Sequence, residues 1–411
     1  MYSSPKDELS RKEFICIIAA LMALNSLAID IMLPALPYMG DAFGIIEENS
    51  QQFIISAYMI GYGLGEIFFG PVSDRFGRKW PLIWGVIIYS LSTLFAVFSP
   101  SFTILLLLRF IQGIGAASTR VVATSVVRDT YSGNAMAEIM SLVIMLFMVI
   151  PILAPSVGQL LLITGPWESI FYAMTVFGVL VGIWVIYRLP ETLSLVHRRA
   201  LTCQSVVDGF RIVISNRSAF FYGLAGMFLF ASLFGFLASA QQIYVGIYHL
   251  DEYFPIAFAS VAALMAIASY TNSKLVRLMG MRLLSHLAII ILILTSGLLA
   301  SLSSRGSVDF ETFYPLLAIT MSCFSWAAAN MNSLSMEPLS EVAGTASSAF
   351  GFIQTVGGVL IGGFIGQQFD GTILPVSIGY FSMGCASFIC ILVAEKGRLF
   401  GSDFNPLVDR Y

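Results

Sequence analysis

Long apolar runs, separated by short polar breaks, constrain this chain more than any other feature of its sequence. A helix needs about 20 mostly apolar residues to cross a bilayer. Runs of this kind are predicted near 14–38, 52–72, 80–98, 102–126, 136–162, 168–188, 219–245, 254–274, 283–302, 313–334, 343–367 and 373–394. Only 11% of the 411 residues are charged, whereas soluble domains carry about a quarter. The sequence therefore predicts an all-α membrane protein with twelve transmembrane helices, surrounded by lipid and with no nucleic-acid partner.

The connections between these runs fall into two groups by charge. Lysine and arginine gather in one set of connections, whereas acidic residues fill the opposite set, where Arg305 is the only base. Basic connections face the cytoplasm, so both termini are expected there. The longest connection, 190–218, is polar and basic, and it predicts a six-helix half at 1–189, a cytoplasmic linker at 190–218 and a second six-helix half at 219–411. Repeats of this kind hold a substrate site between them in known transporters.

Four ionisable residues fall well inside predicted spans, where charges are costly and indicate function. They are Asp30, Glu66, Arg109 and Arg120. Their depths predict two acid–base pairs, Asp30 with Arg109 and Glu66 with Arg120. A buried carboxylate beside an arginine can load or release a proton when their separation changes, so we interpret all four as candidates for proton coupling. The alternative is that permanent ion pairs only fix the packing of the helices.

The stretch 70–79, GPVSDRFGRK, lies between two apolar runs. Its charges cannot lie in lipid without partners, and we expect a tight turn at the cytoplasmic surface. The residues that matter in it are Gly70, Asp74, Arg75, Gly77, Arg78 and Lys79. Arg277, Gly280 and Arg282 follow the eighth predicted span in a similar pattern, which favours two related halves.

Polar and aromatic residues inside spans are candidates for the lining of a substrate cavity. They are Asn25, Tyr58, Tyr62, Gln112, Gln241, Gln242, Tyr244, Asn330 and Gln354. A mostly apolar pocket with a few polar groups is what a small-molecule site needs. Adjacent amides such as Gln241 and Gln242 would be expensive in lipid, whereas packing is the competing interpretation for Gln112.

Glycines at four-residue spacing form stripes in two predicted spans. Gly61 and Gly65 lie in the second span, and Gly358, Gly362 and Gly366 lie in the eleventh. Small residues at this spacing let helices approach closely. The stripes indicate either smooth surfaces on which two halves rock or static packing, and the sequence leaves both open.

Several segments together resemble the bicyclomycin and chloramphenicol resistance (Bcr/CflA) group of drug/proton antiporters in the major facilitator superfamily. These segments are AIDIMLPALP (28–37), GPVSDRFGRK (70–79), LRFIQGIGAA (108–117), VVRD (126–129), RLPETL (188–193) and AGTASSAFGFIQ (343–354). The resemblance implies the major facilitator fold and export of amphipathic compounds driven by inward proton flow.

The resemblance also implies roles for single residues. Asp30 matches the acid at the end of the first helix, Arg109 matches the arginine of the fourth helix, and the 70–79 stretch matches the cytoplasmic gating loop. Glu66 departs from the family, which usually has a neutral residue there; an extra acid would favour cationic substrates or a second proton.

Together with the buried charges, the resemblance implies a proton-coupled efflux transporter for drugs or other small amphipathic compounds. It would work as a monomer in the bacterial cytoplasmic (inner) membrane. A dedicated exporter of one natural metabolite, such as a siderophore or an amino acid, is the alternative. An enzyme is not expected, because His197, His249 and His286 show no metal pattern and no catalytic constellation is present. The absence of a phosphate-binding loop argues against direct use of ATP, and no cofactor or metal is expected.

Overall fold

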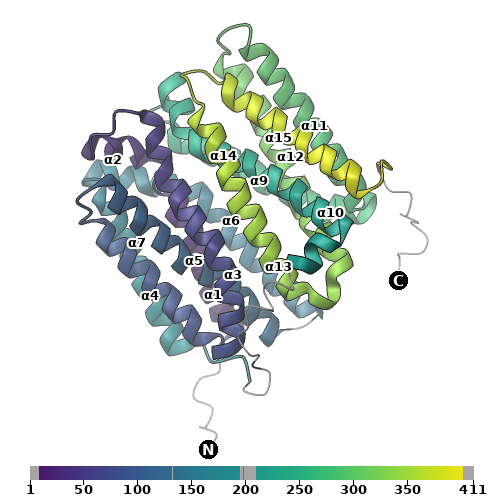
Figure 1. Ribbon diagram of the computed structural model, residues 1–411. Coiled ribbons are helices and arrows are strands. Elements are labelled where there is room, and N and C mark those ends of the chain that lie inside the picture. Colours follow the sequence, from purple (N-terminus) through teal and green to yellow (C-terminus); the bar gives the residue numbers. More distant parts are fainter. Residues whose placement is uncertain (1–8, 132, 195–197, 199–209, 401–411) are drawn as a thin grey trace, which may run out of the picture. The chain divides into compact units, whose positions relative to one another are not determined.

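The structure, a computed structural model, describes residues 9–131, 133–194, 198 and 210–400, and in these ranges it is built from helices without a β-strand (Figure 1). In the described residues, eleven helices are long and apolar enough to cross a membrane. The twelfth expected span lies in α6 (Gly133–Thr164), within which Val149–Thr164 forms a shorter apolar helix. The prediction of an all-α membrane protein is therefore confirmed.

Contacts divide the chain into two compact units. The first unit comprises Met1–Met39 and Ala57–Thr202, and the second comprises Gly40–Ser56 and Cys203–Tyr411. Most of the predicted linker at 190–218 lies outside the described residues, and the division into two six-helix halves stays a prediction. The short segment Gly40–Ser56, which precedes α3 in sequence, belongs to the second unit by its contacts.

In the first unit, α1 packs against α5, α6 and α7, and α4 packs against α5 and α7. The helices concerned are α1 (Arg11–Asp30), α3 (Phe53–Phe76), α4 (Lys79–Ala96), α5 (Phe102–Thr130), α6 and α7 (Glu168–Arg188). Gly61 and Gly65 of α3 lie directly against the backbone of α5 at Phe110 and Ile114, so this glycine stripe serves close packing inside the unit.

In the second unit, α9 is the central helix and packs against α12, α14 and α15. The helices are α9 (Arg217–Gln241), α10 (Phe254–Met279), α11 (Met281–Ser303), α12 (Phe310–Met336), α13 (Ala343–Phe352), α14 (Gly358–Gln367) and α15 (Leu374–Ala394). Gly362 of α14 lies against the backbone of α9 at Ala231 and Gly235. The second glycine stripe therefore also packs two helices of one unit, and static packing is the interpretation that the contacts favour.

Three helices depart from regular α geometry inside their spans. After α1 ends at Asp30, the chain forms a turn, the 3₁₀ helix η1 (Leu33–Ala35) and the short helix α2 (Leu36–Ala42). The π-helical segments η4 (Gln242–Ile247) and η6 (Ile353–Gly357) interrupt the helices that contain Gln242 and Gln354. Such interruptions occur frequently at functional sites.

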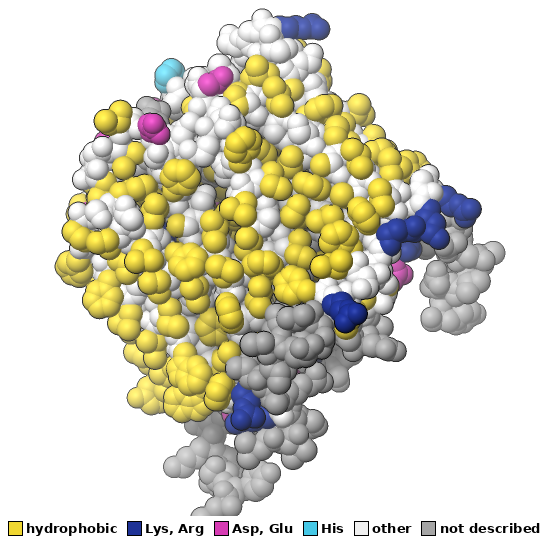
Figure 2. Space-filling model, viewed as in Figure 1, with side chains coloured by type: hydrophobic (Ala, Val, Ile, Leu, Met, Phe, Trp, Pro, Cys, Tyr) yellow, Lys and Arg dark blue, Asp and Glu magenta, His cyan; other side chains and the backbone are white. Residues whose placement is uncertain are grey.

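The outward surface matches a lipid environment. Hydrophobic side chains cover most of the face shown, whereas charged side chains lie near its margins (Figure 2). Large apolar residues such as Phe95, Ile163 and Leu294 are more than half exposed, which would be unfavourable in water but not against acyl chains.

Candidate functional site

Asp30 is placed at the point where α1 breaks. It is the last residue of α1 and is only 5% exposed. Its carboxylate accepts a hydrogen bond of 2.7 Å from the hydroxyl of Ser26, one turn earlier. Gly158 of α6 packs against the carbonyl of Ile31 directly after it, so a side chain at position 158 would push on this break. The carboxylate is thus buried at an irregular part of a membrane helix.

Arg109 is fully buried in α5 and faces the same region of α1. Its Nη2 donates to the carbonyl of Ala28 at 2.9 Å, and Nη1 donates to the amide oxygen of Gln112. The guanidinium also lies 4.5 Å from the centre of the Tyr58 ring, a favourable cation–π contact. Tyr58 in turn donates to the side-chain oxygen of Asn25 at 2.8 Å. Five predicted residues, Asn25, Asp30, Tyr58, Arg109 and Gln112, therefore gather around the end of α1.

The predicted ion pair between Asp30 and Arg109 stays a prediction, because the contacts of the two side chains lie elsewhere. Although both residues lie at a matching depth, Arg109 binds the carbonyl of Ala28, and Asp30 follows Ala28 by two positions. The carboxylate takes the hydroxyl of Ser26 as its hydrogen-bond partner.

The second predicted pair, Glu66 with Arg120, is confirmed. Arg120 Nη1 lies 2.8 Å from Glu66 Oε1, and it joins α5 to α3. The two side chains differ in exposure, because that of Glu66 is 4% exposed and that of Arg120 is 56% exposed. Tyr62, one turn before Glu66, is buried beside both of them.

The 70–79 stretch forms a charged cluster centred on Arg78, which is 3% exposed. Its guanidinium donates to Asp74 at 2.5 Å, to Asp129 at 2.7 Å and to the Ser73 hydroxyl at 2.9 Å. The hydroxyl of Ser73 reaches the Gly70 carbonyl at 2.8 Å. Burial alone lowers the pKa of the Arg78 guanidinium, but Asp129 and Asp74 outweigh it and raise that pKa above its usual value.

Gly77 makes a second attachment of this loop possible. Its φ of 94° lies in the left-handed region, and a side chain there would collide with Glu191. The carboxylate of Glu191 accepts from the backbone N–H groups of Arg78 at 2.8 Å and of Lys79 at 3.2 Å. It thereby caps the start of α4, where negative charge is favoured. Arg75, in contrast, is exposed.

Asp129 and Glu191 are the residues of this cluster to which the sequence analysis gave no role. Both lie in segments that carry the family resemblance, VVRD and RLPETL. The signal that could have found them is a carboxylate directly after a predicted span on the basic side, where a loop arginine needs a partner.

The second unit contains a related cluster around Arg282. Gly280 has a φ of 78°, and Arg282 donates at 3.0 Å to Glu395 and at 3.0 Å to Glu337. Glu395 also accepts from the hydroxyl of Tyr222 at 2.6 Å. The weak repeat seen in the sequence thus corresponds to a repeated arrangement of side chains.

Gln242 takes part in a cluster of neutral amides in the second unit. Gln52 donates to Gln242 at 2.6 Å, and Gln242 donates to Asn49 at 2.8 Å. Asn49 continues to the carbonyls of Gln367 and Phe369 at 3.1 and 2.9 Å. The amides attach the segment Gly40–Ser56 to η4 and to the end of α14. Asn49, Gln52 and Gln367 were not foreseen, because they lie at or beyond the ends of the predicted spans.

The remaining cavity candidates have separate environments. Asn330 exchanges two hydrogen bonds with Asn272, at 3.2 and 2.9 Å, and Tyr244 packs among the rings of Phe254, Phe310 and Phe313. These contacts indicate packing. Gln354 lies on η6 against Gly226 of α9, and Gln241 is half-buried at the end of α9.

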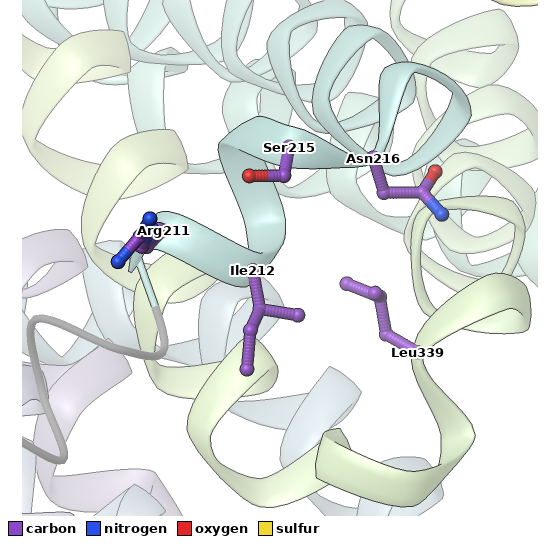
Figure 3. Close-up of a pocket in the computed structure, with 5 residues that line it drawn as sticks. All are labelled: Arg211, Ile212, Ser215, Asn216 and Leu339. Carbon is purple, nitrogen blue, oxygen red and sulfur yellow. The ribbon is translucent and has the colours of Figure 1, made fainter.

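An open cavity of about 410 Å³ lies apart from all of these residues (Figure 3). Its lining consists of Arg211, Ile212, Ser215, Asn216 and Leu339. In the part of the chain that the structure describes, no group of three or more His, Cys, Asp or Glu side chains is placed to hold a metal ion.

Membrane-spanning helices with buried charges at a helix break, and charged clusters at the ends of the spans, define a multi-pass membrane transporter. The model of the Major Facilitator Superfamily matches residues 18–362, and the chain belongs to this superfamily.

Curated relatives cover nearly the whole chain. The chain is 27% identical over 380 residues to the bicyclomycin resistance protein homolog of Haemophilus influenzae, which covers 92% of this chain and 94% of that protein. It is 29% identical over 404 residues to the multidrug resistance protein MdtL of Klebsiella pneumoniae, with 95% and 97% covered. Among solved structures, the xylose transporter XylE of E. coli matches with a TM-score of 0.70 at 13% identity, with 94% and 97% covered, which supports the fold alone.

Proposed function

We propose that the protein is a proton-coupled secondary efflux transporter for drugs or other small amphipathic compounds. The observation that carries the proposal is the buried carboxylate of Asp30 at the break of α1. It occurs in a chain of the Major Facilitator Superfamily that is similar over more than nine-tenths of its length to proteins named for bicyclomycin and multidrug resistance. A buried acid in a membrane helix is a functional site by default.

Asp30 is the proposed proton carrier. Its carboxylate has one neutral partner, the hydroxyl of Ser26, so burial favours the protonated form and contact with water favours the ionised form. Arg109 is held two positions away at the carbonyl of Ala28. A rotation of the end of α1 would bring this positive charge to the carboxylate and release the proton. Glu66 with Arg120 is the second proposed pair for coupling.

Substrate passes, in this account, through alternating access of two halves. The proposed candidates for contact with substrate are Asn25, Tyr58, Tyr62 and Gln112 in the first unit and Gln241, Gln242 and Gln354 in the second. Tyr244 and Asn330, which were expected in the same role, make packing contacts instead. The Arg78 cluster at the 70–79 loop acts as a gate element: its ion pairs hold the ends of α3 and α5 together, and they must exchange partners when the pathway opens on that side.

The proposed location is the bacterial inner membrane with both termini in the cytoplasm. In a variant whose five cysteines are replaced, single cysteines introduced as Glu47→Cys and Arg211→Cys should react with an impermeant reagent from opposite sides. Labelling of both from outside intact cells would overturn this orientation.

The function itself is tested with inverted membrane vesicles that contain the overproduced protein. An imposed pH gradient, acidic inside, should drive accumulation of an amphipathic dye against its concentration gradient, with neutral, anionic and cationic dyes each tried. An ionophore that collapses the pH gradient should abolish the accumulation. Uptake that ignores the ionophore, or vesicles that behave like those without the protein for every drug and dye tried, would contradict the proposal.

A further inference from the structure

Only one of the two charged side chains in the Glu66–Arg120 pair is exposed. The carboxylate of Glu66 is 4% exposed, whereas the side chain of Arg120 is 56% exposed. Arg120 lies well inside α5, about 15 Å along the helix axis from its end at Thr130 at 1.5 Å per residue. A guanidinium at this depth is too costly to face lipid, so its exposed side needs a polar partner.

We propose that Arg120 is a recognition subsite for a carboxylate group on the transported compound. Glu66 accepts from Nη1, Tyr62 is a second side-chain neighbour of the guanidinium, and an arginine has five N–H donors in a planar fork. The remaining donors are available from the exposed side, and such a fork binds a carboxylate through two parallel hydrogen bonds. Glu66, in this arrangement, positions the guanidinium.

Charge balance favours a carboxylate over a phosphate. Glu66 already supplies one negative charge 2.8 Å from Arg120, and a dianion beside it would be repelled at short range in a medium of low dielectric constant. A single negative charge on the substrate meets the exposed positive side of the pair with the least repulsion. The buried hydroxyl of Tyr62, next to both side chains, is a further neutral group at this place.

Of the two arginines inside the span, Arg109 and Arg120, it is Arg120 that a substrate can reach. Arg109 lies on the same face of α5, eleven positions earlier and close to three helical turns away, but it is 0% exposed and bonded to Gln112 and Ala28. The two arginines therefore separate the tasks: Arg109 stays with the proton site and Arg120 meets the substrate. This differs from the expectation, drawn from the extra acid alone, of cationic substrates.

The inference rests on the proposed transport function but is tested without transport. The probes are 1-pyrenebutyric acid, its methyl ester and 1-pyrenebutylamine, which share one apolar body and differ in charge. Binding to the purified protein in detergent, with no pH gradient, is followed by energy transfer from tryptophan to pyrene and corrected against empty micelles. The acid should bind about tenfold or more tightly than the ester or the amine, because hydrogen bonds to charged groups are the strong ones.

Two variants assign the preference to Arg120. The double variant Glu66→Gln with Arg120→Gln removes both charges of the pair together, and it should lose the preference for the acid while it binds the ester as before. Arg120→Lys keeps the charge without the planar fork and should retain a smaller preference. Arg305→Gln, at an exposed loop position, is the matched control and should change nothing.

Each outcome either supports or refutes a carboxylate subsite at Arg120. If the ester or the amine binds wild-type protein as tightly as the acid, or if none of the three probes binds, the subsite is refuted, whatever the vesicle experiment shows. Retention of the full preference in the double variant also refutes it. Preference for the acid in wild-type protein, together with its loss in the double variant, supports the subsite even if transport is not driven by protons.

Discussion

The Arg78 cluster of the first unit and the Arg282 cluster of the second have the same arrangement of residues but differ in their acidic partners and in their exposure to solvent. In each, a glycine in the left-handed region, Gly77 or Gly280, turns the chain between two helices. The arginine that follows joins carboxylates from other helix ends, Asp74 and Asp129 in one case and Glu337 and Glu395 in the other. The repeat seen weakly in the sequence is therefore a repeat of geometry.

The two clusters differ in burial and in what surrounds the charges. The side chain of Arg78 is 4% exposed and that of Arg282 is 33% exposed. Arg78 is surrounded by carboxylates and the Ser73 hydroxyl, whereas Glu395 of the other cluster is shared between Arg282 and the hydroxyl of Tyr222. Screening by solvent weakens exposed pairs, so the first cluster should be the stronger attachment and the second the more adjustable one.

The largest expected effect is the difference in stability between variants at Arg78 and at Arg282. Arg78→Gln leaves Asp129 with an unpaired charge in a mostly buried site, and it should lower the free energy of unfolding by about 3 kcal/mol. Arg282→Gln breaks more exposed pairs and should cost about 1 kcal/mol. Thermal unfolding of both variants in the same detergent measures the difference. Equal losses would show that burial does not distinguish the clusters.

A smaller effect is expected at Asp74, whose side chain is 39% exposed. Asp74→Asn keeps the shape of the side chain while Arg78 retains Asp129, so the melting temperature should stay close to that of wild-type protein. Dye transport in vesicles should fall several-fold, because the loop loses one of the ion pairs that must exchange during opening. The matched control is Glu337→Gln, its exposed counterpart in the second unit. If the Asp74→Asn protein transports dye at the wild-type rate, the ion pair of Asp74 has no part in gating and the loop only connects two helices.

The smallest effect is expected at Tyr222. Tyr222→Phe removes the 2.6 Å hydrogen bond to Glu395 but leaves Arg282 in place, and it should cost about 1 kcal/mol or less. In the double variant Tyr222→Phe with Arg282→Gln, the losses should exceed the sum of the single variants, since Glu395 then loses both partners. Additive losses measured by thermal unfolding would mean that the two partners act on Glu395 independently.

Much of the fold follows from patterns that the sequence carries locally. The apolar runs determine the helices, and the glycines and charges of 70–79 predict a turn with ion pairs, as Gly77 and Arg78 show. Depth along a helix was enough to pair Glu66 with Arg120. These features depend on the length and the order of residues, both of which can be read directly.

Features that depend on rotation about a helix, or on contacts between distant segments, could not be predicted. Depth alone placed Asp30 opposite Arg109, but the hydrogen bonds of the two side chains run to Ser26 and to the carbonyl of Ala28. The amides of Asn49 and Gln52 form hydrogen bonds with Gln242, which is about 190 residues away in the sequence. The helices that pack against the glycine stripes could not be predicted either, because small residues permit close approach without specifying the neighbour.

The most direct test of the central claim pairs two measurements on Asp30→Asn. An amide has nearly the shape of the protonated acid and can still accept the hydrogen bond from Ser26, so the melting temperature in detergent should stay within a few degrees of the wild-type value. Uphill transport of dye driven by a pH gradient should fall to the level of vesicles without the protein, because no protonation cycle remains at this position. A stable Asp30→Asn protein that still accumulates dye against its gradient would contradict the account and would move the proton site to Glu66.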